Sequence, residues 1–123
     1  NKYMGWYHPW PVTPDRAVWD VARGKPLIIS EFGGEALYGQ HGAADTASSW
    51  SEEYQEALYR DNLRMFEYIP NLRGVSPWIL FDFRSPFRFH PTNQEGWNRK
   101  GLVSDRGYRK KAWYLMKAYY DKR

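Results

Sequence analysis

The chain has 123 residues, of which 42% are hydrophobic and 19% aromatic, and its formal net charge at pH 7 is +4. The absence of cysteine excludes disulfide scaffolds and thiolate metal sites, and the three histidines lack the spacing of metal ligands. No apolar run is long enough to span a membrane and the N-terminus lacks a signal-peptide pattern, so we expect a soluble protein without a membrane partner, metal or cofactor, in a compartment that the sequence leaves open.

The chain opens on a short aromatic stretch, and we expect residues 1–7 to be the end of a strand. Thr13 followed by Pro14 is typical of a helix start, with the threonine as cap and the proline in the first turn. The pattern predicts a helix over residues 13–23 that buries Val18, Trp19 and Ala22.

A buried strand is predicted at residues 26–30, where three consecutive aliphatic residues leave no polar face. Glu31 follows where this strand should end, and Gly33-Gly34 then allows the backbone to turn sharply. A carboxylate beside apolar surroundings is costly unless it is used or paired. In barrels of alternating strands and helices, active sites lie at this end of the strands. Glu31 is therefore a candidate nucleophile or acid/base, the alternative being a capping or salt-bridging carboxylate.

Residues 32–48 show little periodicity and are predicted to form a long loop, which in compact domains is usually a lid or binding segment. Glu35, within this loop, is expected to support the site or belong to a lid. Ser49 or Ser51 is predicted to cap a long helix that Pro70 ends. Its inward face is predicted to comprise Tyr54, Ala57, Leu58, Met65, Tyr68 and Ile69.

Residues 71–74 are predicted to turn the chain into a second strand at residues 75–83, although Pro77 disfavours a central position in a sheet. Residues 84–104 form a second predicted loop. A final helix is predicted to begin near Asp105 and to cover residues 110–120. Its inward side chains are expected to be Ala112, Leu115, Met116 and Tyr119, and its outward ones Lys110, Lys111 and Lys117.

The positive charge is concentrated at the C-terminal end of the chain. Residues 1–97 carry nine Lys/Arg against twelve Asp/Glu, whereas residues 98–123 carry nine against two. Such a stretch is typical either of anion or nucleic-acid binding or of a solvated helix face. Because no nucleic-acid motif accompanies it, we favour the solvated helix and expect no nucleic-acid partner.

The predicted order is strand end, helix, strand, helix, strand, helix. Alternation of this kind implies right-handed crossovers and a parallel sheet in the α/β class. Three such strands would leave two open edges and an incomplete core, which indicates a fragment of a larger sheet or barrel.

Four further residues are candidates for the site on position alone. Asp82 would close the second strand between aromatic neighbours, where it could be buried and paired. Trp78 in the same strand could reach a ligand only if the strand bends there. Tyr3 and Tyr7 could donate hydrogen bonds to a carboxylate at a neighbouring strand end.

These residues belong to stretches that resemble glycoside hydrolase family 2, and in particular its β-glucuronidases and short β-galactosidases. The stretches occur in order along the whole chain: Asn1-x-Tyr3-x-Gly5-Trp6-Tyr7, Ile29-Ser-Glu31-Phe-Gly33, Trp50-Ser-Glu-Glu-Tyr54, Trp78-x-x-x-Asp82-Phe83 and Asn98-Arg-Lys100-Gly. The resemblance implies that residues 1–123 are the C-terminal part of a (β/α)8 TIM barrel, covering about its last three strand–helix units. The missing N-terminal part of the barrel would then be an obligatory partner, and an oligomer of the full-length protein stays open.

The resemblance also implies roles. Glu31 matches the catalytic nucleophile of retaining glycosidases, in which a second carboxyl group about 5–5.5 Å away serves as acid and base. In the family that residue is a glutamate preceded by asparagine, and no Asn-Glu pair occurs in this chain, so the isolated fragment is expected to be inactive. Glu35 is a less favoured substitute. The substrate-binding positions matched are Tyr3, Tyr7, Trp78, Asn98 and Lys100, with Asp82, Arg84 and Arg88 as possible supporting residues.

The sugar and the function class stay open between alternatives. An ammonium and an amide at Lys100 and Asn98, with extra cations at Arg84, Arg88 and His90, favour an acidic sugar and hence a β-glucuronidase. A β-galactosidase of the same family is the alternative, since short β-galactosidases can share the Asn-Arg-Lys-Gly stretch. A non-catalytic carbohydrate-binding module is the alternative from another class, but such modules are usually β-sandwiches rather than alternating strands and long helices.

Overall fold

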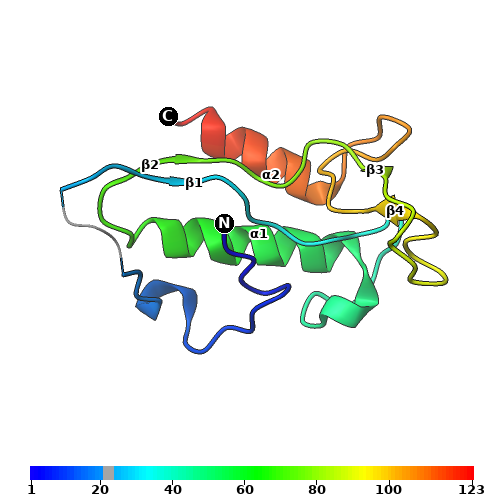
Figure 1. The fold of residues 1–123 in the computed structure, drawn as a ribbon, viewed down its shortest axis with the longest axis horizontal. Helices are drawn as coiled ribbons and strands as arrows, with labels where there is room; N and C mark the ends of the chain where they lie inside the picture. The colour runs from blue at the N-terminus through cyan, green and yellow to red at the C-terminus, as the bar shows by residue number, and fades with distance from the viewer. Residues whose placement is uncertain (21–23) are drawn as a thin grey trace.

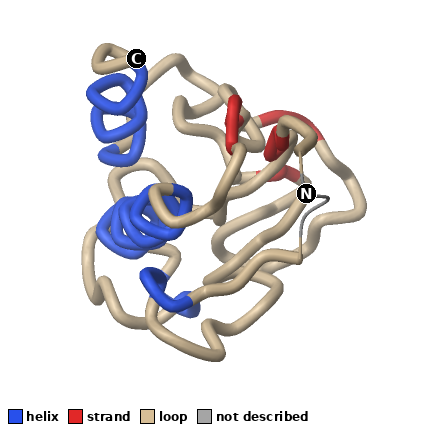
Figure 2. Tube along the Cα trace, turned by 90° about the vertical axis from the view of Figure 1, so that its left-hand side faces the viewer, coloured by secondary structure: helices blue, strands red, loops and turns tan. Residues whose placement is uncertain are grey.

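The computed structural model describes residues 1–20 and 24–123. Its regular elements are, in chain order, η1 (Pro14–Arg16), β1 (Leu27–Ile29), η2 (Ala47–Ser49), α1 (Glu52–Phe66), β2 (Leu72–Val75), β3 (Phe83–Arg84), β4 (Trp97–Asn98) and α2 (Lys111–Tyr120). Figure 1 shows α1 and α2 beside the β1–β2 pair, with β3 and β4 beyond the end of that pair. Figure 2 shows the helices gathered on one side and the strands on the other, a two-layer α/β arrangement.

The parallel pair of β1 and β2 confirms the predicted strand and positions the candidate nucleophile, but only Ile29 of its three residues is buried, so the predicted burial of both faces is wrong within the described residues. Leu27 pairs with Leu72, and after an irregularity in register Ile29 pairs with Val75. Backbone hydrogen bonding between the two segments continues beyond the strands, where the Trp78 amide donates to the Phe32 carbonyl at 2.8 Å. Glu31 and Trp78 are thereby carried to the same end of the pair.

The second predicted strand is wrong in its bounds. Regular structure covers Leu72–Val75, which was predicted in part as a turn, and resumes only at Phe83–Arg84. Between them the Trp78–Ile79 peptide bond is cis. The segment pairs instead with the chain after β4: the Ile79 amide donates to the Lys100 carbonyl at 3.2 Å, and the Asp82 amide to the Val103 carbonyl at 2.9 Å. The predicted loop at residues 84–104 likewise contains β4, which pairs antiparallel with β3.

The first predicted helix is also wrong. Among the described residues 13–20 of this segment, only Pro14–Arg16 are helical, in η1, and Ala17 is already extended. Val18, predicted to be buried, is 94% exposed. The indole N–H of Trp19 donates to the sulfur of Met65 on α1 at 3.3 Å. This long-range contact, and not the local helix preference, sets the path of the chain here. The predicted burial of Ala22 lies outside the described residues.

The N-terminal stretch forms a turn rather than the predicted strand end. The Tyr3 carbonyl accepts from the amides of Trp6, Tyr7 and His8. The Tyr54 hydroxyl on α1 donates to the Gly5 carbonyl, which holds this turn against the helix layer.

The long helix α1 begins as predicted, with the Ser51 hydroxyl accepting from the Tyr54 amide at 3.0 Å as N-cap. Leu58, Met65 and Ile69 of its predicted inward face are buried. Tyr68 is 57% exposed, contrary to prediction, because the helix ends at Phe66 and the following turn directs the chain elsewhere.

The last helix, α2, begins at Lys111, several residues after the predicted start near Asp105. Ala112 and Met116 are buried as predicted. Lys110, predicted to face outward, is fully buried, because its ammonium forms an ion pair with Asp82 at 2.8 Å.

The core lies between the helices and the strand pair. Its buried members come from all parts of the fold: Met4, Ile29, Phe32, Leu58, Tyr59, Leu63, Met65, Phe66, Ile69, Leu102, Ala112 and Met116. Ile28 on the strand pair is 66% exposed, so one side of these strands lacks a covering layer within the described residues. None of the helices in the described part of the chain has the length and apolar character needed to cross a membrane.

Candidate active site

A cavity of about 350 Å³ lies at the end of the β1–β2 pair, where Glu31 and Trp78 emerge. The structure brings to it every residue that the sequence assigned to catalysis or substrate binding, together with Arg88. The lining residues are Tyr3, Tyr7, Glu31, Trp78, Phe83, Ser85, Arg88, Asn98 and Lys100. Trp78 reaches the cavity because the chain leaves the strand after Val75.

The Glu31 carboxylate accepts hydrogen bonds from two side chains of the N-terminal stretch. The Tyr3 hydroxyl donates to its carboxylate at 2.7 Å, and the Asn1 amide donates to the same oxygen at 3.3 Å. Burial and the hydrogen bond to Glu31 both raise the pKa of Tyr3 above its ordinary value. Tyr3 therefore keeps its proton, and its donor role toward the carboxylate, up to a higher pH than an ordinary tyrosine.

The cationic part of the cavity is formed by Lys100 and Arg88, which meet at one hydroxyl. The Lys100 ammonium donates to the Tyr7 hydroxyl at 2.8 Å and the Arg88 guanidinium donates to it at 3.1 Å. Burial would raise the pKa of Tyr7, but these two hydrogen bonds outweigh it and the pKa is lowered. The ammonium also lies 4.8 Å from the centre of the Tyr7 ring, a favourable cation–π distance.

Asn98 and Lys100 are positioned by the short strand β4 and the turn that follows it. Asn98 is buried, and its side-chain oxygen accepts from the Lys100 amide at 3.0 Å. Asn98 also lines the cavity, and the NH₂ group of its side chain is a hydrogen-bond donor. The Asn-x-Lys spacing thus gives one neutral donor and one cation at the same wall.

Asp82 does not line the cavity but anchors the segment that carries Lys100. Its carboxylate accepts from the Gly101 amide at 2.9 Å and from Lys110 at 2.8 Å, and Arg99 lies 3.5 Å away. Burial raises the pKa of Asp82 and lowers that of Lys110, each in the direction that disfavours its charge. The expectation that Asp82 is buried and paired is confirmed.

Arg84 also stays outside the cavity. Its guanidinium carbon lies 5.3 Å from the centre of the Trp97 ring, across the β3–β4 pair. His90, the third cation considered for this loop, packs against Trp50 with ring centroids 5.1 Å apart. Of the three, only Arg88 reaches the cavity.

Sequence reasoning missed Phe83, Ser85 and the buried role of Lys110. Phe83 stands in the Trp78-x-x-x-Asp82-Phe83 stretch, which could have signalled it, and its ring packs on Trp78 at 6.2 Å. Ser85 carries no sequence signal. Lys110 sits in a run of basic residues, where nothing local distinguishes a buried lysine from a solvated one.

Gly101 is required where the Lys100 segment passes Asp82. An added Cβ would lie 2.2 Å from the Asp82 amide nitrogen and 2.5 Å from the Val103 carbonyl oxygen, both backbone atoms that cannot give way cheaply. We expect Gly101→Ala in the complete protein to lower stability by about 2–4 kcal/mol and to weaken substrate binding by displacing Lys100. Thermal unfolding with parallel KM measurements checks this. Gly42→Ala is the matched control, because an added Cβ there meets nothing within 4 Å and φ, as at Gly101, lies outside the left-handed region.

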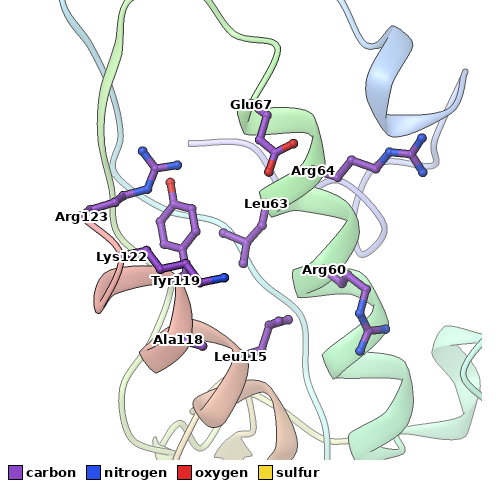
Figure 3. Close-up of a pocket in the computed structure, with 9 residues that line it drawn as sticks. All are labelled: Arg60, Leu63, Arg64, Glu67, Leu115, Ala118, Tyr119, Lys122 and Arg123. Carbon is purple, nitrogen blue, oxygen red and sulfur yellow. The ribbon is translucent and has the colours of Figure 1, made fainter.

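A larger cavity, of about 530 Å³, lies between the C-terminal ends of α1 and α2 and shares no residue with the candidate site. Figure 3 shows the guanidinium groups of Arg60 and Arg64 extending away from its centre. These groups pair with Glu56 at 3.2 Å and Asp15 at 3.3 Å. These two cations are therefore directed away from the cavity, whose other charged lining residues are Glu67, Lys122 and Arg123. The described residues also contain no cluster of three or more His, Asp or Glu side chains able to hold a metal ion.

Comparison with known proteins identifies consistent relatives, although no family model matches the sequence. The β-glucuronidase of Bacteroides fragilis is 33% identical over 131 residues, covering 99% of this chain and 19% of the relative. The crystal structure of a GH2 β-galacturonidase from Eisenbergiella tayi bound to galacturonate has a TM-score of 0.80 at 28% identity, covering 100% of this chain and 23% of that one. A β-glucuronidase from an uncultured Clostridium sp. has a TM-score of 0.71 at 25% identity, covering 81% of this chain and 17% of that one.

The chain thus spans about a fifth of the length of the relatives it matches. Sequence and structure likenesses extend over essentially all of it, through the N-terminal turn, β1 with Glu31, and β4 with Lys100. By these likenesses the chain is similar to the C-terminal region of glycoside hydrolase family 2 enzymes.

Proposed function

We propose that this chain is the C-terminal part of a (β/α)8-barrel catalytic domain in a retaining exo-β-glycosidase acting on β-linked uronic acids, with a β-glucuronide as the substrate. The observation that carries the proposal is that Glu31, Lys100 and Arg88 line one cavity at the end of a parallel strand pair. The barrel is supported by the parallel pairing of β1 and β2, the helix layer on one side of it, and the exposed Ile28 on the strands.

In the proposed reaction, a Glu31 carboxylate oxygen attacks the anomeric carbon of the sugar. The bond to the aglycone oxygen breaks, that oxygen takes a proton from a second carboxyl group, and a glycosyl ester forms on Glu31. Water, deprotonated by the second group, then attacks the same carbon, releasing the sugar and restoring the carboxylate. Tyr3, bonded to Glu31 at 2.7 Å, orients the attacking group throughout.

The second carboxyl group is proposed to lie on a part of the barrel outside this chain. Among the described residues, Glu31 is the only carboxylate that lines the cavity. Glu35, considered as a substitute, is buried and does not line the cavity, and its carboxylate accepts hydrogen bonds from the Arg99 amide at 2.8 Å and from the Gln94 side chain. The 123-residue segment alone is accordingly expected to be inactive.

Recognition of an acidic sugar is supported by the charges at the wall of the cavity. Lys100 and Arg88 both donate to Tyr7 and present an ammonium and a guanidinium to the space that Asn98 also lines. A uronate carboxylate would receive charge-assisted hydrogen bonds there. A neutral galactoside would leave Lys100, which is 1% exposed, desolvated without a substrate anion. This disfavours the β-galactosidase alternative, and a β-sandwich sugar-binding module does not fit the α/β arrangement.

A β-galacturonide is the second candidate substrate. The structural likeness to the Eisenbergiella tayi β-galacturonidase covers the whole chain at a TM-score of 0.80, whereas the likeness to the Clostridium sp. β-glucuronidase covers 81% at 0.71. Glucuronate and galacturonate carry the same carboxylate and differ in the configuration at C4. The cationic wall therefore serves either sugar.

Hydrolysis of aryl β-glucuronide, β-galacturonide and β-galactoside by the complete protein tests the proposal. Release of the aryl alcohol from either uronide, with kcat/KM at least about a hundredfold above that for the galactoside, is expected because Glu35 offsets only one of the two positive charges of Lys100 and Arg88, and a neutral sugar leaves the other without a substrate anion. Preference for the galactoside would overturn the uronide assignment. Sugar binding without hydrolysis, unaffected by substitution of Glu31, would favour the binding-module alternative.

Tyr7 should make uronide binding sensitive to alkaline pH. Its lowered pKa means that the phenolate forms below the usual range of a tyrosine, and that anion would compete with the substrate carboxylate for Lys100 and Arg88. We expect KM for the uronide to rise as the pH approaches this pKa, whereas Tyr7→Phe raises KM severalfold at neutral pH and abolishes the rise. Profiles of KM against pH for both proteins check this. An equally steep rise in the phenylalanine variant would show that another group is responsible.

A further inference from the structure

Glu35 is a buried carboxylate that stands directly behind the cationic wall of the cavity. It is 2% exposed and is absent from the cavity lining. One of its oxygens accepts from the Arg99 amide at 2.8 Å, and the Gln94 side chain donates to both oxygens at 3.1 and 3.0 Å. The carboxylate is thereby fixed to the chain segment that also carries Lys100.

The same carboxylate faces both cations of the wall. Its second oxygen lies 3.5 Å from the Lys100 ammonium and 3.7 Å from the Arg88 guanidinium. Within the described part of the chain, Glu35 is the only carboxylate within 4.0 Å of Lys100. An ammonium that is 1% exposed requires an anion or several acceptors to remain in place, and the other partner of this ammonium is the hydroxyl of Tyr7.

We propose that Glu35 is a positioning residue for uronide binding: it holds Lys100 and Arg88 side by side on the Tyr7 hydroxyl before the substrate arrives. The inference rests on the proposed function and deepens it. Glu35 does not contact the sugar. Its negative charge offsets one of the two positive charges, so that the wall has a net charge of one and matches a single carboxylate. The two long cationic side chains therefore lose their conformational entropy when the protein folds and not when the substrate binds.

Replacement of Glu35 with glutamine in the complete protein tests this role. Glutamine keeps the size of the side chain but removes the anion, so Lys100 and Arg88 lose the group that holds them. We expect KM for the preferred aryl β-uronide to rise at least about tenfold, while kcat stays within about twofold because Glu31 and Tyr3 are not disturbed. Glu56→Gln on α1, which removes a carboxylate paired only with Arg60 in the described residues, is the matched control and should leave both parameters unchanged.

A double-mutant cycle separates positioning from general support of the fold. If Glu35 acts through Lys100, Glu35→Gln should raise KM much less in a Lys100→Met background than in the wild type. A purely structural role would give the same additional loss in both backgrounds and would lower kcat along with affinity. Should Glu35→Gln fail to fold, Glu35→Asp, which keeps the charge but moves it away from both cations, should raise KM severalfold with kcat retained.

Binding of free D-glucuronate and D-galacturonate, measured by calorimetry, keeps this test independent of turnover. An unchanged or lowered KM in a folded Glu35→Gln variant of an active uronidase overturns the positioning role and leaves the proposed function intact. A wild-type protein that hydrolyses no uronide but binds a sugar acid in a Glu35-dependent way overturns the proposed function and supports the positioning role. Absence of both hydrolysis and sugar-acid binding in the wild type overturns the two together.

Discussion

Replacement of Glu31 with glutamine in the complete protein should lower kcat for an aryl β-uronide by at least about 10⁴-fold, since no covalent intermediate can form without the carboxylate. Glutamine retains the side-chain oxygen that accepts from Tyr3, so the N-terminal turn and the cavity should keep their shape. KM, or the dissociation constant of the unreacted uronide, should stay close to the wild-type value because Lys100 and Arg88 are untouched. Single-turnover kinetics and calorimetry measure the two effects separately.

Covalent trapping distinguishes the nucleophile from a merely electrostatic carboxylate. A 2-deoxy-2-fluoro uronide with a good leaving group slows both steps, so that the ester on Glu31 accumulates and appears as a mass increase on the peptide containing residue 31. The label should be absent from the Glu31→Gln protein and present in a Glu35→Gln protein. Labelling of another carboxylate, or turnover within about tenfold of wild type after Glu31→Gln, would contradict the assigned role.

Replacement of Lys110 with methionine should destabilise the protein by about 3–5 kcal/mol, because it removes one partner of a buried ion pair. Lys110 and Asp82 are both fully buried at their side chains and pair at 2.8 Å, and the ammonium also donates to the Ala36 and Arg99 carbonyls at 2.7 and 2.9 Å. With methionine at position 110, the buried Asp82 carboxylate would keep only Arg99, 3.5 Å away, as an ion-pair partner among the described residues. Arg99 also pairs with Asp105. Urea unfolding of the complete protein measures the loss.

Two companion variants identify the cause of this loss. Asp82→Asn added to Lys110→Met removes the isolated charge and should recover part of the stability. Lys117→Met, which breaks an exposed pair with Asp121, should cost no more than about 1 kcal/mol. Equal losses for Lys110→Met and Lys117→Met would mean that the buried pair contributes no more than a surface one. Because Lys110 anchors the segment before Lys100, a raised uronide KM should accompany the destabilisation.

Local sequence pattern was sufficient for the elements whose cause is local. The aliphatic run before Glu31 predicted β1, and Ser49 or Ser51 followed by two glutamates predicted the start of α1, with Ser51 the cap in the structure. It failed where a long-range contact decides the path. The helix expected after Thr13 is replaced by a short turn and by Trp19 packing on Met65, 46 residues away. The strand expected at residues 75–83 is divided because its later half bonds to the segment after β4.

For the site, the sequence by itself predicted most of the residues that meet, through its resemblance to glycoside hydrolase family 2. Glu31, Tyr3, Tyr7, Trp78, Asn98, Arg88 and Lys100 all line one cavity, whereas Asp82 and Arg84 lie outside it. Only the tertiary structure decided how their charges are balanced. Glu35 faces a lysine 65 positions later, and Lys110 reaches an aspartate 28 residues earlier. A buried charge is stable only beside its counter-ion, and which ions become neighbours depends on how distant segments pack, not on the residues beside them in the chain.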